Sequence, residues 1–189
     1  MSEQNTVLRS MHDVGLAGWF GGSLMGAVGL NGAAAQAPNP AERLQIASAG
    51  WDRWAPVNLA AIGAHLVGAA GILVFEAPRV ATQKGVGAMS VAKTALTVAA
   101  LGATAYSRLA GKKMEKAGGA PVEGITEPAA STPEDVSGAQ RQQRVAQWMV
   151  PVFTGALLVV SALAGGQQKP GPVQRGVVAR VREFLAPSA

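Results

Sequence analysis

Residues 54–75 read WAPVNLAAIGAHLVGAAGILVF and contain no charged side chain. An α-helix needs about 20 mainly apolar residues to cross the hydrocarbon core of a bilayer, so this run is long enough to span it. Arg53 precedes the run and Glu76 follows it. The stretch therefore predicts a transmembrane helix and an integral membrane protein.

Three further runs have spanning length. Residues 14–36 and 145–168 carry no charge, and residues 85–107 are interrupted only by Lys93. The part after Lys93 is too short to span alone and would also suit a buried or interfacial segment. We expect four spans and an all-α bundle of transmembrane helices. The predicted segments are an N-terminal piece (1–13), three helices with short loops (14–107), a long polar loop (108–144), a fourth helix (145–168) and a basic tail (169–189).

Composition agrees with a lipid environment. Only 14% of the 189 residues are charged, whereas soluble domains carry about a quarter. The absence of cysteine excludes disulfides, thiolate metal sites and a cysteine nucleophile. The net charge is +5, but the basic residues flank apolar runs. We therefore expect the lipid bilayer, and not nucleic acid, as the partner of this charge.

The first run has a second interpretation, as a signal peptide. Residues 35–37 have the small-x-small form of a cleavage site. However, Glu3, Arg9 and Asp13 give the preceding region mixed charge, and the apolar run is longer than the usual signal core. We expect an uncleaved helix.

The two polar segments differ in character. Residues 108–144 have few large apolar side chains, which predicts disorder. In the tail, one helical face would carry four apolar residues: Val173, Val177, Val181 and Phe184. This basic amphipathic helix would lie on anionic lipid headgroups, and a frayed, solvated tail is the alternative.

Orientation is not decided by charge. With four spans, the 16 Lys and Arg residues divide equally between the two sides of the membrane, so the positive-inside rule gives no answer. Contact of the basic tail with the anionic leaflet favours cytoplasmic termini and the plasma membrane.

Small and amide side chains suggest how the helices associate. Gly18, Gly22 and Gly26 are four residues apart, so they share one helical face and allow close approach of a neighbouring helix. Such faces also suit other membrane proteins or a second copy of the chain. Asn31 and Asn58 come at matching depths on antiparallel helices, which predicts a hydrogen bond between them. Four aromatic residues fall at that level, as an interfacial belt would: Trp51, Trp54, Tyr106 and Trp148.

The two histidines are candidates for chemistry. His65 lies about 15 Å inside the membrane and His12 just outside it, so the depths predict a separation of about 20 Å. That separation argues against two axial ligands of one haem. We expect a neutral His65 that is hydrogen-bonded to a neighbouring helix. Lys93 has a similar depth and is either functional or directed toward the interface.

The segment His12 to Gly22 reads His-x6-Trp-x-Gly-Gly, with Trp19 as its aromatic residue. It resembles the first helix of the four-helix membrane superfamily of CopD-type copper-resistance proteins and membrane-bound protoporphyrinogen oxidase. Lys93 with Tyr106 downstream is similar to the lysine and aromatic of that superfamily's third helix. The resemblance implies a shared site of His12 and Lys93 with haem b or copper. The oxidase's Leu-Pro-Arg and Tyr-His elements have no counterpart, so the resemblance concerns architecture more than activity.

Three functions follow from these observations. The first is a non-enzymatic accessory or assembly protein that acts through helix contacts. The second is a haem- or copper-related redox protein that uses His12 and Lys93. The third is a small-solute permease, if Thr94, Thr97 and Thr104 line a pore. No phosphate loop or zinc-protease motif occurs, and no carboxylate lies inside a run, so an enzyme is not favoured.

Overall fold

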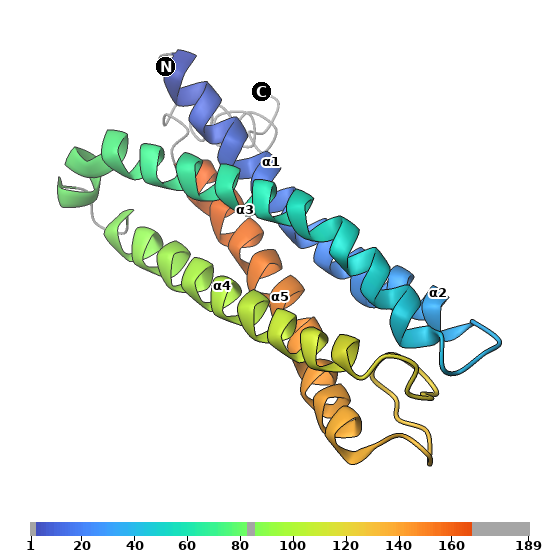
Figure 1. Ribbon diagram of the computed structural model, residues 1–189. Helices are drawn as coiled ribbons and strands as arrows, with labels where there is room; N and C mark the ends of the chain where they lie inside the picture. Colours follow the sequence, from blue (N-terminus) through green and yellow to red (C-terminus); the bar gives the residue numbers. More distant parts are fainter. Residues whose placement is uncertain (1–2, 83–85, 168–189) are drawn as a thin grey trace, which may run out of the picture.

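The protein is an all-α bundle, as predicted (Figure 1). The computed structural model describes residues 3–82 and 86–167. Its elements are α1 (Glu3–Met25), the π-helical turn η1 (Gly26–Leu30), α2 (Asn31–Ala35), α3 (Arg43–Thr82), α4 (Val86–Lys116) and α5 (Glu134–Gln167). These described residues contain no strand, and an isolated bridge joins Val122 to Pro128.

The first three elements form one continuous helical rod. Met25, Leu30 and Asn31, at the junctions, all have right-handed helical backbone angles. Residues 3–14 contain no glycine or proline, so nothing interrupts the helix before the apolar run. The rod therefore begins well before the start predicted from charge alone.

Three helical stretches are long and apolar enough to cross a membrane: Arg43–Phe75, Gly87–Lys116 and Glu134–Ala164. Among the described residues, α1 does not meet this criterion. Its α-helical part includes Glu3, Arg9 and Asp13, whereas several residues of the apolar run 14–36 fall in η1 and α2. Three candidate spans are thus established by length and composition, and the fourth stays a prediction.

The helices associate mainly as two pairs. In Figure 1, α1 runs beside α3, and α4 runs beside α5. The pairs meet chiefly where α1 contacts α5, and α3 and α4 pack more loosely. Two clusters fill the interior. One surrounds Trp19, Ala100 and Val150, and the other lies at the end where α2 turns into α3.

The prediction that residues 108–144 are disordered is wrong. Helix α4 continues to Lys116 and α5 begins at Glu134, so helices occupy much of this range. Within the connecting segment, Val122 and Ile125 are buried against Leu44 and Met114. The low apolar content of this segment did not predict its order correctly, because the burial of Val122 and Ile125 is enough to hold it against the helices.

Side chains from the helices complete the fold of this connection. The Arg43 guanidinium donates hydrogen bonds to the carbonyl oxygens of Val122 (3.0 Å) and Glu123 (2.7 Å). The buried Gln140 amide donates to the Gly124 carbonyl at 2.9 Å. Since these backbone groups are satisfied by protein side chains, the segment needs no strand or helix of its own. The predicted tail, residues 169–189, lies outside the described residues.

Candidate functional site

A close helix crossing between α1 and α3 depends on two glycines. A Cβ added at Gly15 would lie 2.6 Å from the backbone nitrogen of His65 and would also clash with the Ala61 carbonyl. A Cβ added at Gly68 would lie 2.5 Å from both the backbone nitrogen of His12 and the Leu8 carbonyl oxygen. The two backbones therefore touch, which any larger residue would prevent.

This crossing brings the two histidines together. Gly15 faces the backbone of His65 and Gly68 faces the backbone of His12, so the antiparallel crossing places the two histidines side by side. Their ring centroids are 4.5 Å apart. The predicted separation along the membrane normal is therefore wrong. It assumed that each helix begins at its flanking charges, whereas α1 starts nine residues before His12.

Each nitrogen of the His65 ring has a polar neighbour. Nδ1 lies 3.3 Å from the His12 carbonyl oxygen, and Nε2 lies 3.4 Å from the Thr97 hydroxyl of α4. The His65 side chain is fully buried. The His12 ring, also buried, has Nδ1 2.7 Å from the Asp13 carboxylate. A neutral imidazole can donate from one nitrogen and accept at the other, which suits both positions of His65.

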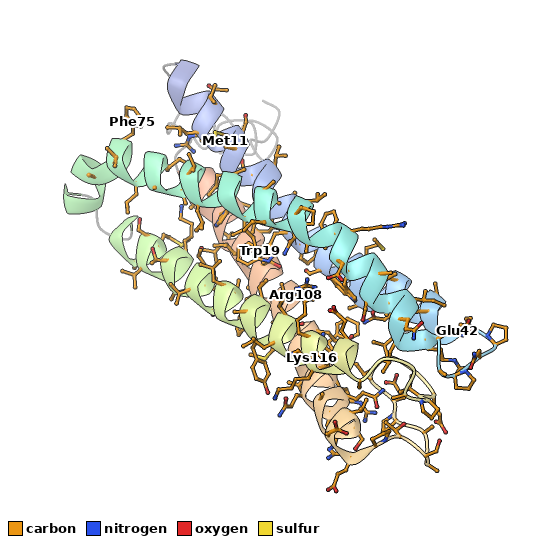
Figure 2. All side chains as sticks on the ribbon, in the orientation of Figure 1. Met11, Trp19, Glu42, Phe75, Arg108 and Lys116 are labelled. Carbon is orange, nitrogen blue, oxygen red and sulfur yellow. The ribbon has the colours of Figure 1, made fainter. Side chains whose placement is uncertain are left out.

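Trp19 extends this cluster toward the middle of the bundle, where Figure 2 shows it. Its ring centroid lies 6.1 Å from that of His65, and its side chain is fully buried. The indole Nε1 donates to the Thr104 hydroxyl at 3.1 Å. The cluster therefore links α1 and α3 to α4 through two hydroxyls, those of Thr97 and Thr104.

Lys93 approaches the cluster from α4. It is half-buried and lies one helical turn before Thr97, whose hydroxyl faces the His65 ring. No hydrogen bond or ion pair between Lys93 and His12 is found in the described part of the chain. The two residues that the family resemblance singles out thus flank His65 without direct contact.

The other glycines of α1 face two tryptophans of α3. A Cβ at Gly22 would clash with the Trp54 ring and one at Gly26 with the Trp51 ring, while a Cβ at Gly18 would lie 3.3 Å from the Ala61 methyl. The glycine row therefore lies along the α1–α3 seam, and the two indoles pack over it.

The predicted hydrogen bond between Asn31 and Asn58 is wrong. The Asn31 amide donates to the Gln147 carbonyl oxygen at 3.0 Å, and its own carbonyl accepts from the Trp51 indole at 2.9 Å. The Asn58 carbonyl oxygen is buried without a partner. Counting residues from the membrane surface predicts how deep a side chain lies but not which face of its helix it occupies. The Asn31 amide group reaches Gln147 of α5. Gln147, missed by sequence reasoning, could have been found as an amide inside the fourth apolar run.

A haem does not fit between the two histidine rings as they stand. With metal–nitrogen bonds of about 2 Å, two axial imidazoles place their centroids about 6 Å apart, farther than the 4.5 Å found here. Nδ1 of His12 and both nitrogens of His65 already face polar groups. Within the described residues, no group of three or more His, Asp or Glu side chains could hold a metal ion.

Comparison with known proteins gives no assignment. No protein-family model, no curated protein and no solved structure matches the chain. Any role for these residues therefore rests on their geometry.

Proposed function

We propose that this chain is a non-enzymatic accessory protein of the plasma membrane that binds a transmembrane helix of another membrane protein. Several of its buried polar side chains form hydrogen bonds with each other across helices. Trp19 bonds to Thr104, Asn31 to Gln147, and Gln143 to Ser107 at 2.9 Å. Groups engaged in this way stabilise a bundle and are not free to act on a substrate.

A shallow apolar groove supplies the docking surface, and it is the observation that carries the proposal. The groove has a volume of about 510 Å³ and runs along the outer side of the α1–α3 seam. Its lining residues are Gly22, Met25, Gly26, Gly29, Leu30, Gly50, Trp51, Arg53 and Trp54. Gly29 is exposed in this groove, and an exposed glycine lets a second helix approach closely, where dispersion contacts replace the missing hydrophobic effect.

Site-specific photo-crosslinking tests this docking surface. A diazirine amino acid at Met25, which is 59% exposed, is expected to crosslink to one other membrane polypeptide in intact cells. The same probe at Val98, exposed on α4 outside the groove, is the matched position and should label lipid only. Equal crosslinking from both positions would contradict the proposal.

A substitution that fills the groove gives a second test of the docking surface. Gly29→Leu adds a side chain into the groove, and the nearest atom is the flexible Met25 sulfur at 3.3 Å. We expect the crosslink yield at Met25 to fall about tenfold, as overpacking a contact costs about 1–3 kcal/mol. Gly63→Leu, an exposed position with open space around it, should leave the yield unchanged. A crosslinked product with twice the mass of the chain would show that the partner is a second copy of this chain.

The topology that accompanies this function has four spans, with both termini cytoplasmic. Two features support it: α1 packs along α3, whose apolar stretch is long enough to span, and the basic tail would meet anionic lipid headgroups. The glycine row of α1 would then drive the first association of helices in lipid by the small-xxx-small mode.

The redox alternative rests on two buried histidines that lie side by side, although their rings are too close to take a haem between them. An absorption spectrum of the detergent-purified protein decides it. A Soret band that disappears in His12→Ala would support haem binding and contradict the accessory function as stated. The permease alternative is not favoured. The exposed Thr94 hydroxyl donates to the Ser90 carbonyl oxygen, and the Thr104 hydroxyl accepts from the Trp19 indole, so neither hydroxyl is free to line a pore.

A further inference from the structure

A second feature, independent of the outer groove, is a cavity of about 340 Å³ inside the bundle. It lies between the α1–α3 and α4–α5 pairs, at the end near α2. Ser23, Asn58, Thr104, Gln143 and Gln147 contribute polar groups to its wall. Leu44, Ile62, Met114, Ile125 and Val150 contribute apolar surface. Small-molecule sites commonly have volumes of about 300–1,000 Å³ and this mixed lining.

Three residues of the lining each have a buried polar atom that lacks a hydrogen-bond partner. These atoms are the Trp54 indole nitrogen, the Asn58 carbonyl oxygen and the Gln143 carbonyl oxygen. Leaving such groups unpaired is unfavourable, because burial removes the hydrogen bonds that each would make to water. Three of them around one cavity indicate an occupant that accepts one hydrogen bond and donates two.

The charged groups near the cavity indicate that this occupant is neutral. Arg108 and Glu115 line the wall. Arg108 pairs with Asp52 of α3 at 2.6 Å, and Lys112 pairs with Glu115 at 2.6 Å and with Asp52 at 3.5 Å. These four groups neutralise each other, so a charged ligand would have to break existing pairs.

The cavity also opens sideways toward lipid. Leu59 lines it and is nevertheless 70% exposed, so the wall continues onto the outer surface of α3. The opening lies where α3 and α4 pack loosely, and Figure 2 shows Arg108 facing this gap. An apolar chain can leave through such an opening without entering water.

We propose that the cavity binds the head of an uncharged lipid with free hydroxyl groups, with its acyl chain leaving between α3 and α4. Two hydroxyls donate to the carbonyl oxygens of Asn58 and Gln143, and an ester carbonyl accepts from the Trp54 indole. The volume exceeds the roughly 30 Å³ share of a water molecule about tenfold, which accommodates such a head. This ligand site goes beyond the docking function and does not depend on it.

The test uses monoolein as the probe and native mass spectrometry as the readout. The full chain in phosphatidylcholine nanodiscs is titrated with monoolein, and one bound molecule per chain is expected. Asn58→Leu and Trp54→Phe each remove one recognition atom and should weaken binding about tenfold. Circular dichroism checks that each variant is folded, and Trp54→Phe keeps the ring that covers Gly22.

Ser161→Ala is the matched control. Its hydroxyl is also buried without a partner, but it does not line the cavity. Its monoolein affinity should equal that of the unmodified chain. Oleic acid, with a charged head, should bind at least tenfold more weakly than monoolein because the ion pairs leave it no partner.

Three results would overturn the proposal. The first is the absence of saturable one-to-one binding, which would leave a cavity filled with water. The second is unchanged affinity in both Asn58→Leu and Trp54→Phe. The third is equal binding of free glycerol, which would make the site one for soluble polyols. None of these results affects crosslinking at the outer groove, so the two proposals fail separately.

Discussion

Two glycines set the position of the histidine pair. Gly15 and Gly68 each face the backbone of the opposite helix, so the distance between α1 and α3 has no room for a side chain at either residue. This crossing brings the rings of His12 and His65 into contact. The polar cluster at the middle of the bundle therefore depends on residues that have no side chain.

Gly68→Ala is expected to destabilise the protein by about 1–3 kcal/mol, as overpacking does. The new methyl would lie 2.5 Å from backbone atoms of α1, which cannot rotate away as a side chain can. The measurement is the thermal unfolding midpoint in detergent. Gly63→Ala, where the added Cβ meets open space, should keep or raise the midpoint because alanine favours helix. Equal effects of the two substitutions would show that the crossing is not this close.

The contact of His65 with Thr97 is expected to stabilise the association of α3 with α4. Thr97→Val removes the hydroxyl that lies 3.4 Å from Nε2 of His65. Interhelical hydrogen bonds in membrane proteins contribute about 0.6 kcal/mol, so the single substitution should lower stability by that amount. In a His65→Leu background, Thr97→Val should have no effect. A double-mutant cycle on unfolding free energies measures this coupling, and strictly additive losses would contradict it.

At the scale of elements, α2 positions Asn31 between two partners. Because the rod continues through η1 without a break, Asn31 reaches Gln147 of α5 and Trp51 of α3 together. We expect Asn31→Leu to cost about 1–3 kcal/mol, since it leaves both partners unsatisfied. Asn58→Leu should be neutral or stabilising in lipid-free detergent, because the Asn58 carbonyl oxygen has no partner to lose. Unfolding midpoints compare the two, and the reverse order would refute the network.

The elements were predictable from sequence to the extent that they depend on charge-free runs. Residues 54–75 lie within α3 and residues 145–167 lie within α5, because lipid tolerates few charges whatever the packing. Helix ends were missed where polar residues continue the helix, as in α1 and α4. The partners of Asn31 and His65 could not be derived, since they depend on the rotation of each helix about its axis. The ordered segment after α4 was missed because Arg43 and Gln140, far along the chain, supply its hydrogen bonds.

At the scale of the whole molecule, the segment between α4 and α5 closes one end of the bundle. Arg43 at the start of α3 holds it through two carbonyl oxygens. We expect Arg43→Ala to raise the rate of cleavage by a glutamate-specific protease about tenfold or more, through local opening at Glu123 and Glu127. Arg53→Ala, on the same helix but without contact to this segment among the described hydrogen bonds, should leave the rate unchanged. Rapid cleavage of the unmodified chain would show that the segment is not held.

The number of membrane crossings depends on whether α1 follows α3 through the bilayer. By composition α1 is not a candidate span, yet its backbone touches α3 at Gly15 and Gly68, inside an α3 stretch that is long and apolar enough to span. A helix held at that level by backbone contact lies at the same depth as its partner. We therefore expect α1 to cross the bilayer with α3.

Cysteine labelling tests this topology directly, because the chain contains no cysteine and each introduced thiol is the only one. With four spans, Asn39→Cys and Ala130→Cys should react with a membrane-impermeant maleimide from one side, and Gln4→Cys and Ala77→Cys from the other. If α1 stays on one surface, Gln4→Cys would instead react from the same side as Asn39→Cys. That result would require the close crossing to form outside the hydrocarbon core, where the buried histidines could exchange with water and no fourth span would exist.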